Sequence, residues 1–232
     1  MDPITIARSF VEELHAGADA SILGGSAALG RATSTSDLDI AILYEGGNAN
    51  YAETVRYRGW IVEAFVHTPA SLDFWYEKEK AVRCAVIGDI CARGLLLTDN
   101  GPGKTWQDQA RLYMEQGPSP LTDGERDLRR YDLSCSLDDL IGSTISAETF
   151  AIASEVFHQA AELLLLQHRM WLGKGKWVVR RLEQIPHDKG ALELLAWAAS
   201  GGKDQHKLVK IAGDILKNNG GYSMEGFLRG AR

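Results

Sequence analysis

Two aspartates that follow a glycine–serine turn are the feature that most constrains how this chain can fold. The apolar run Ala20–Leu23 predicts a buried strand, and Gly24-Gly25-Ser26 follows it. After a spacer of ten residues (27–36), Asp37 and Asp39 open a second apolar run. Side chains alternate along a strand, so both aspartates share one face, about 7 Å apart. Two such carboxylates repel each other unless a cation lies between them, and Mg²⁺ prefers carboxylates together with phosphate oxygens. The pattern predicts a metal-dependent site for phosphoryl transfer; the alternative is a surface loop with an aspartate as a helix cap.

A third carboxylate, Glu63, lies in an apolar arm of a predicted β-hairpin. Segments 54–57 and 60–68 flank Arg58-Gly59, as in a hairpin whose turn contains glycine. A lone carboxylate is costly to bury without a cation or a hydrogen-bonding partner. Glu63 is therefore a candidate ligand, unless this arm is an edge strand that turns Glu63 to water. Weaker candidates in polar or turn-like segments are Glu45, Glu53 and Asp73.

These residues together resemble the nucleotidyltransferase superfamily that includes DNA polymerase β and the aminoglycoside and lincosamide nucleotidyltransferases. Its pattern is a Gly-Ser turn, a spacer, Asp-x-Asp on a strand and a third carboxylate on a neighbouring strand. Gly25-Ser26, Asp37-Leu38-Asp39 and Glu63 match that pattern. The resemblance implies that Asp37, Asp39 and Glu63 are catalytic and bind metal. Whether Glu63 is a metal ligand, a general base toward the acceptor hydroxyl, or both stays open.

The resemblance also implies the co-substrate and the cofactor. A nucleoside triphosphate, ATP or another, is expected together with two Mg²⁺ ions. The glycines Gly24 and Gly25 let backbone N–H groups approach phosphates, and Ser26 and Ser36 are further predicted nucleotide contacts. No Gly-x-x-x-x-Gly-Lys-Ser/Thr or Gly-x-Gly-x-x-Gly sequence lies between a predicted strand and helix, which disfavours rival phosphate-binding folds.

Two lysines in the second half of the chain are predicted to contact the nucleotide. Lys174 and Lys176 lie on a glycine-containing loop between helices, and lysine is a common partner of phosphates. Aminoglycoside-modifying relatives have a lysine at a similar point that reaches the triphosphate. The alternative is a solvated loop between two helices.

The predicted fold is α+β, with an N-terminal nucleotidyltransferase domain (1–117) and a C-terminal helical substrate- and nucleotide-binding domain (121–232). The N-terminal domain should hold a small mixed sheet with helices at 4–14, 72–91 and up to 116. The break between the domains is Gly117-Pro118-Ser119-Pro120. Thr122 and Glu125 then form a capping box that starts a helical bundle. Its helices are predicted at 125–141, 147–172, 177–184, 190–199 and 203–218.

Composition and charge limit the classes of protein to which this chain can belong. The chain has 232 residues, 45% of them apolar and 24% charged, with neither a long apolar run nor a signal peptide. Its three cysteines lack zinc-like spacing, so a cytoplasmic protein with reduced thiols is expected. Through Leu121 there are 10 Lys and Arg against 16 Asp and Glu. The excess of acidic residues in this part of the chain disfavours binding of nucleic acid and favours a cationic acceptor.

The leading hypothesis is a Mg²⁺-dependent enzyme that transfers AMP to a hydroxyl of a small molecule, such as an aminoglycoside or lincosamide antibiotic, and so confers antibiotic resistance. The alternatives are transfer of AMP or another nucleotide to a protein or an RNA end, and a non-catalytic nucleotide-binding relative. A homodimer through a face with His168 and Trp171 stays open. The stripe Glu148, Glu155 and Glu162 either meets a cationic acceptor or is solvated.

Overall fold

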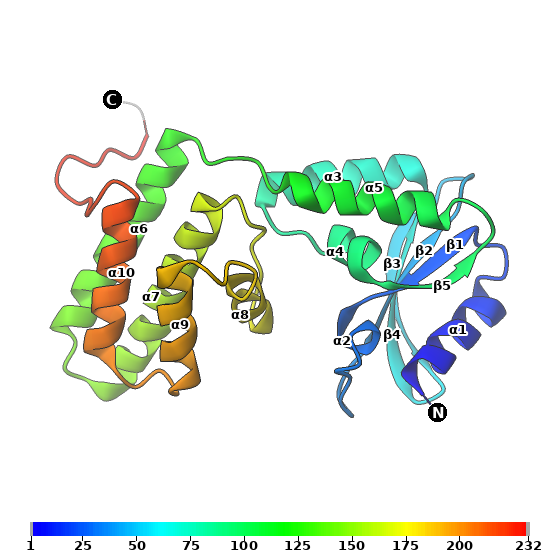
Figure 1. Cartoon of the computed structure of the whole chain (residues 1–232), viewed down its shortest axis with the longest axis horizontal. Coiled ribbons are helices and arrows are strands. Elements are labelled where there is room, and N and C mark those ends of the chain that lie inside the picture. The colour runs from blue at the N-terminus through cyan, green and yellow to red at the C-terminus, as the bar shows by residue number, and fades with distance from the viewer. Residues whose placement is uncertain (1, 231–232) are drawn as a thin grey trace. The chain divides into compact units, whose positions relative to one another are not determined.

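The computed structural model describes residues 2–230 and confirms the predicted α+β class, with a mixed five-stranded sheet and, over those residues, ten helices (Figure 1). The chain divides into two compact units, one ending at Gly117 and the other beginning at Pro118. In chain order the elements are α1 (Pro3–Leu14), β1 (Ala20–Leu23), α2 (Gly25–Ala28), β2 (Leu38–Leu43), β3 (Asn50–Tyr57), β4 (Trp60–His67), α3 (Pro69–Val82), α4 (Ile87–Arg93), β5 (Leu95–Asp99), α5 (Gly103–Gln116), α6 (Asp123–Gly142), α7 (Ser146–Gln167), α8 (Lys176–Leu182), α9 (Lys189–Ala199) and α10 (Gln205–Asn218).

The sheet of the N-terminal unit has the strand order β3-β4-β2-β1-β5. Strands β2 and β4 run parallel, whereas β3 with β4, β1 with β2 and β1 with β5 are antiparallel. Because β4 lies between β3 and β2, it is an interior strand, and the edge-strand alternative for Glu63 is wrong.

Each face of the sheet is covered by helices, because the strands are apolar on both faces. Helix α1 packs Ile6 and Phe10 against one face, together with Ile40 and Val62. Helices α3, α4 and α5 cover the other face, where Ala41 and neighbouring residues pack against them. Figure 1 shows α3 and α5 on one side of the strands and α1 on the other. Asp39 shares the face of Ala41, since side chains alternate along β2.

A single helix was predicted over 72–91, and this is wrong: α3 ends at Val82 and α4 begins at Ile87. Arg83 ends α3 in a left-handed conformation with φ of 58°. In a continuous helix the N–H groups of residues 86–88 would bond to carbonyls four residues earlier. Instead, the buried carboxylate of Glu79 accepts all three, at 2.6, 2.6 and 3.2 Å. One side chain thus redirects the chain and starts α4.

Replacing Glu79 with leucine is expected to lower the free energy of unfolding by about 3 kcal/mol, because three backbone donors lose their acceptor inside the protein. The Tyr113 hydroxyl, which donates to the same carboxylate at 3.2 Å, loses this bond but keeps the carbonyl of Tyr76 as an acceptor, at 3.1 Å. Urea unfolding followed by circular dichroism measures the change. The matched control is Glu77→Gln on the same helix, where the side chain is 73% exposed and pairs with Lys80. A loss at Glu79 no larger than at Glu77 would show that the N–H groups find other partners.

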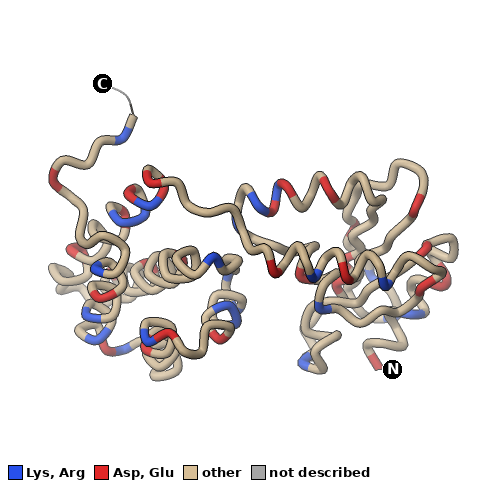
Figure 2. Tube along the Cα trace, turned by 45° about the horizontal axis from the view of Figure 1, so that its top comes forward, with Lys and Arg blue, Asp and Glu red and all other residues tan. Residues whose placement is uncertain are grey.

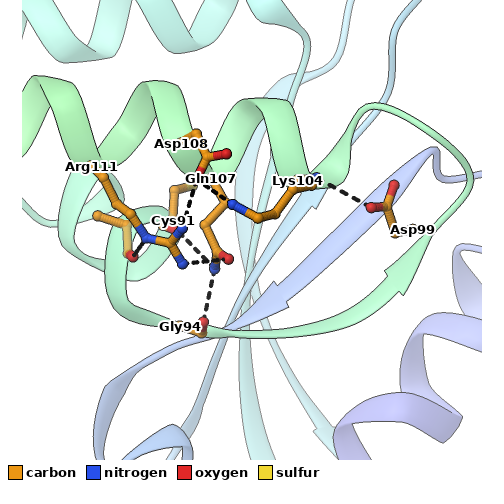
Figure 3. A network of polar contacts seen from close by, with 8 residues as sticks. Cys91, Gly94, Asp99, Lys104, Gln107, Asp108 and Arg111 are labelled. Carbon is orange, nitrogen blue, oxygen red and sulfur yellow. Dashed lines mark hydrogen bonds and ion pairs between the residues drawn. The ribbon is translucent and has the colours of Figure 1, made fainter.

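A network of hydrogen bonds connects α5 to α4 and to the end of β5 (Figure 3). The amide of buried Gln107 donates to the carbonyl of Gly94 at 2.9 Å, and Arg111 donates to the carbonyl of Ala92 at 3.2 Å. The Asp99 carboxylate accepts the first two backbone N–H groups of α5, at 2.8 and 3.2 Å. Hydrogen bonds from the backbone lower the pKa of Asp99 below its ordinary value. These bonds hold α4, α5 and the end of β5 together as one layer.

The C-terminal unit is a helical bundle around α7, in which residues 163–166 are all buried. The predicted capping box is confirmed: Thr122 Oγ1 accepts the N–H of Glu125 at 3.2 Å, and the Glu125 carboxylate accepts the N–H of Thr122 at 2.9 Å. The prediction for α7 extended too far, to residue 172. The helix ends at Gln167 because Arg169 is left-handed, with φ of 55°.

Basic and acidic residues are interspersed along the trace of both units (Figure 2). Many of them form ion pairs one helical turn apart, such as Lys210 with Asp214 at 3.0 Å. Over residues 2–230, no helix is both long and apolar enough to span a bilayer.

Candidate active site

The turn after β1 lies directly against the start of β2. The N–H of Gly24 donates to the backbone carbonyl of Asp39 at 2.7 Å. Gly25 has φ of +61°, and a Cβ at this position would lie 1.9 Å from Oδ2 of Asp39. Only a residue without a side chain fits this close approach, which explains the second glycine of the turn. The turn is thus shaped around the carboxylate of Asp39.

The structure brings three of the predicted carboxylates together in the N-terminal unit. Asp37 immediately precedes β2, Asp39 is its second residue, and Glu63 is the direct partner of Asp39 in the parallel pair of β2 and β4. One oxygen atom from each of the three lies within 4.8 Å of the others, and all three side chains are half-buried. Asp37 and Asp39 come together through alternation within one strand, whereas Glu63 joins them through the register between two strands.

The donor set of this acidic cluster, Asp37, Asp39 and Glu63, fits a hard divalent cation. Carboxylate oxygens are the protein ligands that Mg²⁺ prefers. Among residues 2–230, Asp37 and Glu63 have no ion-pair partner that could offset their mutual repulsion. Half-burial also leaves room for water or phosphate oxygens as further ligands. The residues present are therefore compatible with magnesium.

The predicted serines lie beside the turn and are bonded to each other. The hydroxyl of buried Ser26 donates to Oγ of Ser36 at 3.1 Å, and Ser36 accepts the backbone N–H of Thr33 at 2.9 Å. The end of the spacer therefore folds back onto the start of α2. Gly24, Gly25, Ser26 and Ser36 thus adjoin the acidic cluster, while their contact with a nucleotide stays a prediction.

The other predicted contacts, Lys174 and Lys176, belong to the C-terminal unit and are exposed. Lys176 is the first residue of α8, after Gly175 with φ of +53°. The guanidinium carbon of Arg180 lies 4.7 Å from the ring centroid of Trp177, so an arginine already packs on this ring. The role of the two lysines rests on the resemblance alone.

One of the weaker acidic candidates and two glutamates of the α7 stripe have partners elsewhere. Glu53 lies 3.8 Å from the ring of His15, and Glu162 forms an ion pair with Arg129 at 2.5 Å. Glu155 accepts a hydrogen bond from Gln159 at 2.8 Å, as expected for a solvated helix face. These pairings give no support to a second acidic site on α7.

The sequence analysis missed Ile90 as a residue that shapes the turn. A Cβ on Gly24 would lie 2.8 Å from Cγ1 of Ile90 and 3.1 Å from its Cα, so α4 supports the turn from behind. The apolar residues of 87–93 indicate burial, but nothing in a single sequence indicates which turn they pack against.

The N-terminal part of the chain is similar to a known protein family. Residues 4–96 match the family described as the nucleotidyltransferase domain. Among solved structures, the chain is similar to a nucleotidyltransferase-like protein from Exiguobacterium sibiricum 255-15, with 13% identity and a TM-score of 0.43. That match covers 93% of this chain and 73% of the other. No curated protein matches the chain.

Proposed function

We propose that this protein is a nucleotidyltransferase that transfers a nucleoside monophosphate to a hydroxyl group of a small molecule, because residues 4–96 match the family described as the nucleotidyltransferase domain. ATP is the proposed donor, pyrophosphate the leaving group and Mg²⁺ the metal. The observation that carries the proposal is the convergence of Asp37, Asp39 and Glu63 within 4.8 Å, directly beside the Gly-Ser turn.

Each part of the site has a role in this proposal. The backbone of Gly24, Gly25 and Ser26 approaches the phosphates closely, because the two glycines leave no side chain in the way. Asp37, Asp39 and Glu63 hold the cations. Bound Mg²⁺ supplies positive charge that stabilises the charge developing on phosphate oxygens. Lys174 and Lys176 are proposed as further nucleotide contacts, on the resemblance.

The proposed reaction is a single in-line displacement. The acceptor oxygen forms a bond to the α-phosphorus, and the bond from that phosphorus to the oxygen bridging to the β-phosphate breaks. Pyrophosphate leaves with the electrons of the broken bond. The hydroxyl proton passes to the carboxylate of Glu63, which lies within the cluster, and then to water. Aminoglycosides and lincosamides are the acceptors that the resemblance suggests.

Calorimetric titration of nucleoside triphosphates, with and without Mg²⁺, tests the proposal. We expect binding of at least one triphosphate that is at least tenfold tighter with Mg²⁺, and loss of that enhancement in a combined Asp37→Asn, Asp39→Asn variant. The control is Asp73→Asn, at an exposed carboxylate on α3 of the same unit. Binding that is indifferent to Mg²⁺, or equal in the two variants, would contradict the proposal.

A further inference from the structure

A cavity of about 380 Å³ lies inside the N-terminal unit, next to the acidic cluster but not lined by it. Its walls come from β3, β4, α3 and the segment between α3 and α4. We call it the Phe65 cavity, after the residue of β4 in its wall; seven further residues used below also line it: Ala52, His67, Trp75, Lys78, Glu79, Val82 and Val86. Its volume falls within the range of about 300–1,000 Å³ that is typical of small-molecule sites.

The Phe65 cavity begins one pleat away from the catalytic carboxylates. Phe65 follows Glu63 by two residues on β4, so their side chains stand on the same face, about 7 Å apart. The neighbouring strand repeats this step, since Thr54 is the partner of Glu63 and Ala52 is the partner of Phe65. A molecule in the cavity that extends one pleat along β4 therefore reaches Glu63.

The phosphate side and the cavity lie on opposite sides of the cluster. The Gly-Ser turn follows β1, which borders β2 on the side away from β4. Leu23 pairs with Ile40, which places the turn at the beginning of β2. Phe65 pairs with Ala41, further along β2. Asp39 and Glu63 thus stand between the turn and the cavity, both across the sheet and along the strands.

This order matches what an in-line displacement requires. The entering and leaving oxygens stand on opposite sides of the phosphorus. If the turn holds the phosphates that leave, the acceptor hydroxyl approaches from the side of Glu63 that faces the cavity. The cavity is therefore placed for the acceptor and not for the leaving pyrophosphate.

The walls of the cavity are apolar and aromatic. Val82 and Val86 lie at its exposed side, with 66% and 52% of each residue exposed, and Trp75 also lines it. The ammonium of Lys78 lies 5.0 Å from the ring centroid of Trp75, so the cationic side chain at this wall is held by a π-face. A polycation would have to bury ammonium groups against these walls without partners, which is costly.

Two further titratable side chains of the lining, Glu79 and His67, already have partners within the protein or are uncharged. The Glu79 carboxylate accepts the N–H groups at the start of α4. Burial lowers the pKa of His67 to about 4, so its ring is neutral at pH 7, and Nδ1 lies 3.1 Å from the hydroxyl of Ser71. Neither group is therefore available to pair with a cationic ligand.

We propose that the Phe65 cavity binds an apolar, ring-bearing part of the acceptor and directs its hydroxyl to Glu63. This inference rests on the proposed function and narrows it: the acceptor is an uncharged hydroxyl compound with an aromatic or alicyclic ring, and not a polycationic aminoglycoside.

The test uses 3-phenyl-1-propanol as the acceptor probe and propylbenzene as its analogue without a hydroxyl. Binding of both is measured by nuclear magnetic resonance on the full chain. Val86→Arg and Ala52→Trp are designed to obstruct the cavity from two different segments of its wall, at exposed positions outside the catalytic cluster. Leu112→Arg is the matched control, because Leu112 is 60% exposed on α5 and does not line the cavity.

We expect binding of both probes to weaken at least tenfold in Val86→Arg and in Ala52→Trp, and to stay unchanged in Leu112→Arg. Label from ATP carrying radioactive α-phosphorus should pass to 3-phenyl-1-propanol, and propylbenzene should compete. Binding that survives both obstructing variants, or the absence of binding to the unaltered protein, overturns the inference.

The two proposals fail in different ways. If Mg²⁺ and ATP bind as expected but label passes to kanamycin and propylbenzene does not inhibit, the cavity is not the acceptor site while the proposed function stands. If the probes bind in the cavity but no nucleoside triphosphate binds, the proposed function fails and the acceptor role of the cavity fails with it.

Discussion

Replacing Asp39 with asparagine is expected to reduce nucleotide transfer about 1,000-fold or more, while the protein stays folded. The amide keeps the size of the side chain but removes one of three negative charges that lie within 4.8 Å of one another. Charge stabilisation at a metal site contributes several kcal/mol to the transition state, and each 1.36 kcal/mol is a factor of ten in rate. Release of pyrophosphate, in the presence of an accepted hydroxyl compound, measures the loss.

The thermal unfolding of this variant separates a chemical effect from a structural one. The backbone carbonyl of Asp39, which accepts the N–H of Gly24, is unchanged by the substitution. Removing a charge from a crowded cluster also relieves repulsion. We therefore expect a melting temperature equal to or above that of the unaltered protein. Asp73→Asn, at an exposed position on α3, is the control for activity. Full turnover in Asp39→Asn would rule out the assignment of this carboxylate.

Replacing Gly25 with alanine is expected to lower the transfer rate about 100-fold, because the new methyl group cannot coexist with the carboxylate of Asp39. The Cβ would lie 1.9 Å from Oδ2 and 3.0 Å from Cγ of that residue. The carboxylate must move, and displacing a reacting group by about 1 Å can reduce the rate about 100-fold. The rate constant at saturating substrate is the quantity to measure.

Gly30 provides a matched control for the backbone contribution. It has φ of +64°, against +61° at Gly25, but a Cβ there would meet nothing within 4 Å. Both Gly→Ala variants therefore pay about 1 kcal/mol for a left-handed conformation, which urea unfolding measures. Only the variant at Gly25 should lose activity. Equal activity losses in the two variants would show that backbone strain, and not displacement of Asp39, is responsible.

Local features of the fold were predictable where neighbours in sequence supply the interaction. The capping box of Thr122 and Glu125 spans three residues, so its two hydrogen bonds follow from the sequence. The α+β class follows from short apolar runs before Gly117 and long helical periods after it. The split between α3 and α4 was not predictable, because a carboxylate seven to nine residues earlier replaces the ordinary helical acceptors.

The candidate site also has one part that was predictable from the sequence and one part that was not. Asp37 and Asp39 face the same side because side chains alternate along one strand, which the sequence predicts. The glycine turn that contains Gly25 was also predictable from the sequence. The position of Glu63 opposite Asp39 depends on the parallel register of β2 and β4. This register pairs two residues that are 24 positions apart in the sequence. A hydrophobic pattern indicates which face of a strand is buried, but it does not say which strand lies next to it.

By itself, the sequence determined the acidic pair, the glycine turn and the two-part α+β organisation, because each depends on residues close together in the chain. Only the tertiary structure decided the position of Glu63 opposite Asp39, the packing of Ile90 behind Gly24 and the existence of a cavity beside Phe65. These depend on strand order and helix packing. Such contacts join segments that are distant in the sequence. Which segments pair depends on the free energy of the whole fold, so the sequence of one segment does not predict its partner.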